Sequence, residues 1–213
     1  SVFQATIPLG IPIESFPIAK NVIDEKVFAK LKTLGLPTSE ICDDSTFLRR
    51  TSLDIAGRLP TLEETDKYLN SDNPNKRSEW IDSLLSTTDY AEFFANKWSS
   101  ILRNKRKADT YTRGTQAFHE WIRQSFHINK PYNQFVSELV TARGEISHNP
   151  ATAWFRNVTD QKERLQDTAQ VLLGVRLQCA ECHHHPYEKW SQQDYYGFSA
   201  FFSRIGKKKT DMP

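Results

Sequence analysis

The chain of 213 residues is poor in cysteine and glycine, with three and eight residues respectively, and it holds a single methionine. Three cysteines cannot all pair with one another, so a disulfide framework does not hold this fold together. No apolar run approaches the roughly 18 to 20 residues that span a bilayer. We therefore expect no membrane span. The cysteines are expected to have a more specific role than a disulfide framework.

Net charge is also scarce, since 28 Lys and Arg stand against 26 Asp and Glu for a formal charge of +2. A dedicated nucleic-acid-binding domain carries a strong basic excess on one face, so we expect no nucleic-acid partner. Hydrophobic residues make up 38% of the chain and aromatic residues 12%. This content is too rich for disorder, and the chain is long enough to bury a core.

The first 20 residues are expected to form an extended lead-in or linker, because residues 7–13 hold two prolines and a glycine. Residues 21–213 are expected to form a single helical domain. Apolar side chains recur there at spacings of three and four, and there is no sustained alternation of apolar and polar residues of the kind that strands show. The sequence predicts an all-α fold of eight to ten short helices around one core. The expected helices cover residues 21–35, 44–57, 61–69, 73–85, 88–102, 115–127, 131–142, about 160–175 and roughly 191–203.

Two of these helix starts carry explicit capping signals. Thr61 and Glu64 have the spacing of a capping box, in which the Thr oxygen accepts from a first-turn N–H and the Glu reaches back. Asn73 followed by Pro74 predicts a cap and a proline in the first turn of the next helix.

Cys179, Cys182 and His183 form a C-x-x-C-H motif. Two thiols at this spacing can add to the two vinyl groups of a haem while the imidazole ligates the iron. One helical turn places both sulfurs along the same haem edge. The motif predicts covalently bound haem c, attached through Cys179 and Cys182, with His183 as the proximal iron ligand.

Zinc is the alternative cofactor. Cys42, Cys179 and Cys182 together with a histidine such as His185 supply a ligand set of the kind that holds structural Zn²⁺. A plain disulfide or free thiols also fit the two cysteines. A thioredoxin-like dithiol is disfavoured because the βαβ context of that motif is missing.

A sixth iron ligand would have to come from elsewhere in the chain. His184 and His185 follow the proximal ligand too closely to cross to the opposite face of the same ring. The available residues are His119, His127, His148 and Met212. Of these, His119, on a predicted helix, and His148, in a predicted loop, are the better candidates. If neither ligates the iron, the metal is five-coordinate and open to gas binding or peroxidatic chemistry.

Two stretches of the chain resemble a known family. Residues 44–61 are similar to an FLRR-x-x-LD-x-x-G-x-LPT signature, and Cys179, Cys182, His183, His185 and Pro186 keep a C-x-x-C-H-x-H-P motif. Both are features of the planctomycete-type cytochrome-like domain, a bacterial domain of unknown function, and the resemblance runs over residues 23–202. It implies an exported protein, periplasmic or at the cell surface, in or beside a larger multidomain chain. It also implies c-type haem, with His185 beside it.

The leading hypothesis is a cytochrome-like module that passes electrons to a redox partner protein or an attached catalytic domain. We therefore expect an electron-transfer or accessory domain rather than a stand-alone enzyme. Two alternatives stay open: a zinc- or disulfide-stabilised structural or interaction module, and a haem or metal oxidoreductase acting on a substrate. The sequence shows no carboxylate pair typical of glycosidases, no P-loop and no G-x-S-x-G motif.

Overall fold

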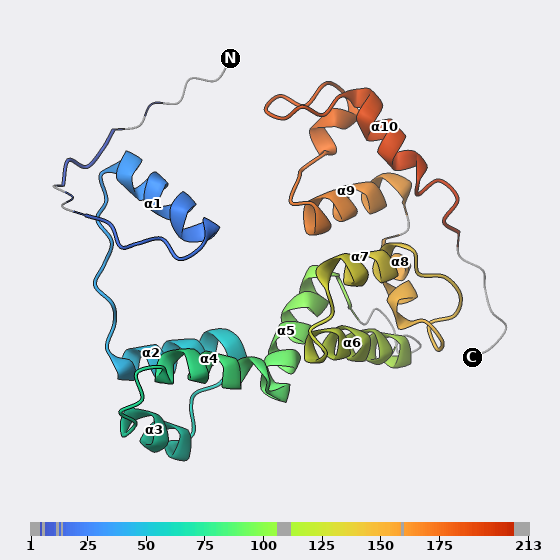
Figure 1. The fold of residues 1–213 in the computed structure, drawn as a ribbon. Coiled ribbons are helices and arrows are strands. Elements are labelled where there is room, and N and C mark those ends of the chain that lie inside the picture. Colours follow the sequence, from blue (N-terminus) through green and yellow to red (C-terminus); the bar gives the residue numbers. More distant parts are fainter. Residues whose placement is uncertain are drawn as a thin grey trace. The chain divides into compact units, whose positions relative to one another are not determined.

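The computed structural model describes residues 5, 7–11, 13, 15–105, 112–158 and 160–206. Over these residues every regular element is helical and none is a strand, so the all-α prediction is confirmed (Figure 1). In the same residues no helix is both long and apolar enough to cross a membrane. Contacts divide the chain into two units, Ser1–Phe47 and Leu48–Pro213. The division expected between residues 20 and 21 stays a prediction.

The first unit contains one complete helix, α1 (Val22–Leu34), which begins and ends where the sequence predicts. Asn21 accepts hydrogen bonds from the backbone N–H groups of Ile23 and Asp24, and Gly35 ends the helix in the left-handed conformation. None of the residues of α1 is buried. The described residues before Asn21 contain no helix, in keeping with the expected extended lead-in.

The remaining helices follow in chain order (Figure 1). They are α2 (Asp44–Thr51), the π-helical turn η1 (Ser52–Ala56), α3 (Leu62–Leu69), α4 (Lys76–Leu85), α5 (Thr88–Ile101), α6 (Thr112–His127), α7 (Tyr132–Val140), the 3₁₀ turn η3 (Pro150–Ala153), α8 (Trp154–Asn157), α9 (Gln161–Leu172), the 3₁₀ turn η4 (Gln178–Glu181) and α10 (Gln192–Ala200).

Two clusters of buried apolar side chains lie in the second unit. The first joins α5, α6, α7 and η3, with Phe118, Ile122 and Leu139 fully buried in it. The second joins α9, η4 and α10 through six buried residues, Leu165, Ala169, Leu177, Ala180, Tyr195 and Phe202. Because Ala180 belongs to both the C-x-x-C-H motif and the second cluster, the motif is packed against α9 and α10 through this residue.

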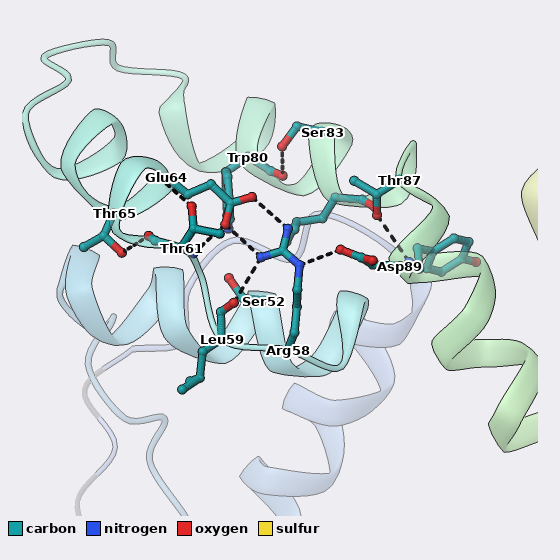
Figure 2. Close-up of polar contacts among 12 residues, drawn as sticks. Ser52, Arg58, Leu59, Thr61, Glu64, Thr65, Trp80, Ser83, Thr87 and Asp89 are labelled. Carbon is teal, nitrogen blue, oxygen red and sulfur yellow. Dashed lines mark hydrogen bonds and ion pairs between the residues drawn. The ribbon is translucent and has the colours of Figure 1, made fainter.

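Arg58 joins η1, α3 and α5 through its guanidinium group (Figure 2). Its two Nη atoms each donate to a different carboxylate oxygen of Glu64 at 2.8 Å, and its Nε donates to Asp89 at 2.5 Å. Glu64 also completes the predicted capping box with Thr61. The hydrogen bonds from Arg58 lower the pKa of Glu64 to about 2, because they stabilise its charged form. The second half of the residue 44–61 signature therefore has a structural role.

The structure differs from the predicted helices at several places. Helix α6 begins at Thr112, three residues before its predicted start, and residues 52–56 form a π-helical turn within the predicted helix 44–57. Helix α4 begins at Lys76 with Asn75 as its cap, two residues later than predicted, because the Asn73 side chain accepts from the backbone N–H of Asn75 and closes a turn instead. The short elements η3 and α8 were not predicted. They have only four residues each, which is too few for an apolar periodicity to show.

Candidate functional site

The two motif cysteines lie on one tight turn. Cys179 belongs to η4 and Cys182 is the residue that ends it, so the two are three positions apart. Side chains three apart on a 3₁₀ turn project on the same side. Both cysteines are unpaired and exposed, whereas Ala180 between them is fully buried. The turn is thus anchored by Ala180 and presents both thiols to solvent.

Glu181, the other residue between the cysteines, is bonded to both neighbouring helices. On the α9 side, one carboxylate oxygen accepts from Lys162 Nζ at 2.6 Å. The other oxygen accepts from the Tyr195 hydroxyl of α10 at 3.3 Å and from the Gln166 amide of α9 at 3.4 Å. Its backbone carbonyl accepts from the Gln192 amide at 3.0 Å. These contacts connect the motif to α9 and α10 at once.

The electrostatics of this cluster follow from the same contacts. The hydrogen bond from Lys162 is the largest cause of the lowered pKa of Glu181. Burial raises the pKa of Tyr195, whose ring is part of the second apolar cluster. The cluster therefore holds one carboxylate against one ammonium group, with a neutral phenol donating to the carboxylate.

The imidazole of His183 is oriented by the main chain. Its Nδ1 lies 2.6 Å from the carbonyl oxygen of His184. A carbonyl oxygen can only accept, so Nδ1 carries the proton and donates. In the neutral ring the lone pair is then on Nε2, which is the arrangement that metal-binding histidines commonly have.

The next two histidines have the opposite arrangement. His185 Nδ1 accepts from the backbone N–H groups of Tyr187 and Glu188, at 3.3 and 3.0 Å, and His184 Nδ1 accepts from that of Gln192 at 3.4 Å. Their Nε2 atoms therefore carry the proton in the neutral rings. Of the three consecutive histidines, only His183 presents a bare Nε2. His185 closes the loop, since its backbone N–H also donates to the Trp190 carbonyl.

Aromatic rings flank the motif on its exposed side. The Tyr196 hydroxyl donates to the Glu181 carbonyl, and the Tyr187 ring lies 6.4 Å from that of His185. Tyr196 is 49% exposed and Tyr187 is 76% exposed. Unlike the buried ring of Tyr195, these two rings leave apolar surface uncovered near His185 and Glu181.

The zinc alternative has a different geometric requirement. Within the described ranges, no three His, Cys, Asp or Glu side chains are grouped so that they could hold a metal ion. Cys42 is partly buried and belongs to the unit Ser1–Phe47, whereas Cys179, Cys182 and His185 belong to the other unit. The four-residue zinc set stays a prediction.

The two proposed sixth ligands have separate surroundings. His119 lies on α6, and its Nε2 is 3.1 Å from the side-chain oxygen of Asn96 on α5. His148 lies in a turn, as predicted, with its side chain 85% exposed and its Nδ1 at 3.4 Å from the Ser147 hydroxyl. Because the Asn96 amide oxygen can only accept, His119 Nε2 carries the proton and donates, which leaves Nδ1 as the accepting atom in the neutral ring. Iron ligation by either residue stays a prediction.

Sequence reasoning missed two features. The Glu181 cluster joins residues 14 and 19 positions apart, and its only local signal is that Lys162 and Gln166 share a face of α9. The second feature is a pocket of about 430 Å³ lined by aromatic residues of α5, α6 and α7, among them Tyr90, Trp98 and Tyr132. Its α5 residues, Tyr90 and Trp98, lie within the predicted helix over residues 88–102.

Comparison with known proteins gave one match. A family model described as PSCyt2, protein of unknown function (DUF1549), matches residues 22–207. No curated protein and no solved structure matches the chain. The matched range includes all the helices of the described second unit and the whole C-x-x-C-H segment.

Proposed function

The chain belongs to the PSCyt2 family, whose function is unknown, and we propose that it is a c-type cytochrome-like electron-transfer module. Cys179 and Cys182 would form the thioether bonds to haem, and His183 would ligate the iron through Nε2. The planctomycete-type cytochrome label suggested by the sequence motifs is part of this proposal. When bound, the haem supplies a one-electron Fe(III)/Fe(II) couple.

The observation that carries the proposal is the hydrogen bond from His183 Nδ1 to the His184 carbonyl. It fixes the ring in the tautomer whose Nε2 can bind a metal, and it does so at the one histidine that the motif assigns to iron. A structural zinc site needs four converging ligands, whereas this attachment needs only one imidazole from the motif. One available Nε2 beside two thiols meets the requirement of haem attachment, whereas a structural zinc site needs a fourth ligand as well.

The surroundings of the thiols also fit haem. Both cysteines project on the same side of η4, so two sulfurs can reach one edge of a planar group. The exposed rings of Tyr187 and Tyr196 offer apolar surface against which such a group can pack. Covalent haem attachment in bacteria takes place outside the cytoplasm, so the proposal includes a periplasmic or cell-surface location. The electron partner is a redox protein or an attached catalytic domain.

The test is export of the chain in a bacterial host that carries haem-attachment machinery. We expect a red protein whose Soret band survives acid–acetone extraction, and a Cys42→Ser variant that behaves in the same way. Replacing Cys179 and Cys182 by serine removes both thioethers and should leave no covalent haem. A colourless wild-type protein with stoichiometric zinc from this host would overturn the proposal.

The three consecutive histidines provide a matched comparison. In His183→Ala we expect an altered haem spectrum that added imidazole restores, because the proximal ligand is lost. In His184→Ala and His185→Ala we expect the wild-type spectrum, because neither residue presents a bare Nε2. A wild-type spectrum in His183→Ala would show that another residue ligates the iron.

Binding of external ligands separates electron transfer from substrate chemistry. An iron with two protein ligands binds carbon monoxide or cyanide slowly, and an open position binds them readily. Rapid binding to wild type would favour the oxidoreductase alternative. In that case His119→Ala and His148→Ala should bind carbon monoxide and cyanide at the wild-type rate. If wild type binds them slowly instead, faster binding in one of these variants would identify the replaced histidine as the sixth ligand.

A further inference from the structure

Glu181 is one of the two residues between the motif cysteines. The C-x-x-C-H pattern assigns it no role, yet its side chain forms hydrogen bonds with residues of two helices. We propose that Glu181 is a positioning residue, which together with Lys162 and Tyr195 holds both thiols ready for double attachment. This inference rests on the proposed haem function and names what prepares that site before haem arrives.

The Glu181 carboxylate is shared between α9 and α10. One oxygen accepts from Lys162, and the other accepts from Tyr195 and Gln166. Lys162 and Gln166 are four positions apart and therefore share one face of α9. Bonds to partners on two helices fix both the position and the rotation of the Glu181 carboxylate.

Both residues between the cysteines are fixed, Ala180 by apolar burial and Glu181 by hydrogen bonds. Ala180 is fully buried in the apolar cluster of α9 and α10. Glu181 is held through its side chain and through its carbonyl, which accepts from Gln192 and Tyr196. The backbone between Cys179 and Cys182 thus has little freedom even though both thiols are exposed.

Attachment of haem to two thiols requires two successive additions. Each thiol adds across one vinyl double bond: sulfur bonds to one carbon, a proton goes to the other carbon, and nothing is oxidised or released. The second addition is intramolecular, so its rate depends on how often the second thiol is in reach of its vinyl group. A rigid turn raises that fraction, whereas a mobile one lowers it.

Glu181 has a matched control in the same segment. Glu188 is exposed, and its side chain makes no hydrogen bond or ion pair with the described residues. Glu188→Gln therefore removes one carboxylate near the motif without touching the cluster. Glu181→Gln keeps the shape of the side chain, but it replaces one of the two accepting oxygens by an NH₂ donor and removes the charge that pairs with Lys162.

The experiment uses the haem-free protein with Cys42→Ser, so that only two thiols remain. Dibromobimane loses two bromides and two protons are released as it bridges two thiols, and monobromobimane reacts with one thiol at a time. The ratio of the two rates measures whether both thiols are presented together. We expect this ratio to fall about tenfold in Glu181→Ala and about threefold in Glu181→Gln, since the effective molarity of the second thiol falls.

A ratio in Glu181→Ala equal to that of wild type and Glu188→Gln would overturn the inference. Because alanine can also loosen the fold, thermal unfolding is measured in parallel. Glu181→Gln and Tyr195→Phe serve as mild variants, and an unchanged ratio in both would contradict the proposed role.

A second arm measures double attachment of haem in the exporting host by the mass of the denatured protein. We expect Glu181→Ala to accumulate protein with one thioether or none. If wild type takes up no haem while the bimane ratio still falls, the haem proposal fails, and Glu181 positions the two thiols but not for haem attachment. If wild type attaches haem and the ratio is unchanged, the positioning role fails alone.

Discussion

At the scale of single residues, Gly57 occupies a conformation and a space that no other residue fits. It follows η1 with φ of 70° in the left-handed region, and a Cβ built on it would lie 2.3 Å from the ring of Phe93 on α5. The hydrogen atom of glycine therefore lets the end of η1 approach the Phe93 ring.

We predict that Gly57→Ala lowers the free energy of unfolding by about 2–4 kcal/mol, from the left-handed backbone and from displacement of the Phe93 ring. Gly174→Ala is the control, because Gly174 has φ of 69° but nothing within 4 Å of its Cβ position. That variant should lose only the backbone part, about 1 kcal/mol. Urea unfolding measures both, and equal losses would contradict the steric argument.

The chemistry of the candidate site was predictable at the residue scale only in part. The C-x-x-C-H spacing identifies Cys179, Cys182 and His183, because the motif is local in the sequence. The tautomer of His183 was not predictable, since it depends on where the backbone directs the His184 carbonyl. Glu181 was missed for a related reason: its partners come from helices that only the folded chain brings together.

At the scale of elements, the Arg58 cluster is the electrostatic link among η1, α3 and α5 (Figure 2). Glu64 has a folded pKa of about 2, below its ordinary value of 4.5. A depressed carboxyl pKa stabilises the fold above pH 4.5, and this stability is lost as the pH falls from 4.5 towards 2.

We predict that the free energy of unfolding of wild type falls by about 1–2 kcal/mol more than that of Glu64→Gln when the pH is lowered from 5 to 2.5. This range allows for solvent screening of a partly exposed ion pair. Urea unfolding across this pH range gives the comparison. Glu63→Gln, at an exposed neighbouring position, should keep the wild-type pH dependence. Parallel curves for wild type and Glu64→Gln would show that Arg58 does not stabilise the Glu64 charge.

Helix boundaries were predictable where a cap or glycine marks them. Asn21, Gly35, Thr61 and Gly57 all take the roles that the sequence indicates. The start of α4 was wrong by two residues because Asn73 and Asn75 are both good caps, and the Asn73 side chain closes a turn with the second. The choice between two candidate caps two residues apart depends on the local hydrogen bond that the Asn73 side chain accepts from Asn75 N–H.

At the scale of the whole molecule, buried side chains are unevenly distributed. Every buried residue in the described parts of the chain lies at Leu48 or later, and α1 has none. The apolar burial that stabilises the described fold therefore belongs to the unit Leu48–Pro213.

We predict that a fragment of residues 40–213 folds and unfolds cooperatively, with a midpoint within about 3 °C of that of the whole chain, since burial of apolar area dominates stability. The fragment keeps Asp43, whose side chain accepts from the backbone N–H of Thr46 at the start of α2. Differential scanning calorimetry measures both proteins. A much lower midpoint, or loss of the cooperative transition, would show that residues 1–39 stabilise the fold.

The hydrogen bond that orients His183 has a consequence for mutational robustness. Its acceptor is a main-chain carbonyl, which every residue type supplies, so no side-chain replacement at position 184 deletes it. A ligand held by a carboxylate partner would lose its orientation through one codon change in that partner. Here the orientation of the His183 ring depends on the path of the backbone. In random mutagenesis, we therefore expect the substitutions that abolish iron ligation to fall mainly at His183 itself and at residues that determine the conformation of the loop.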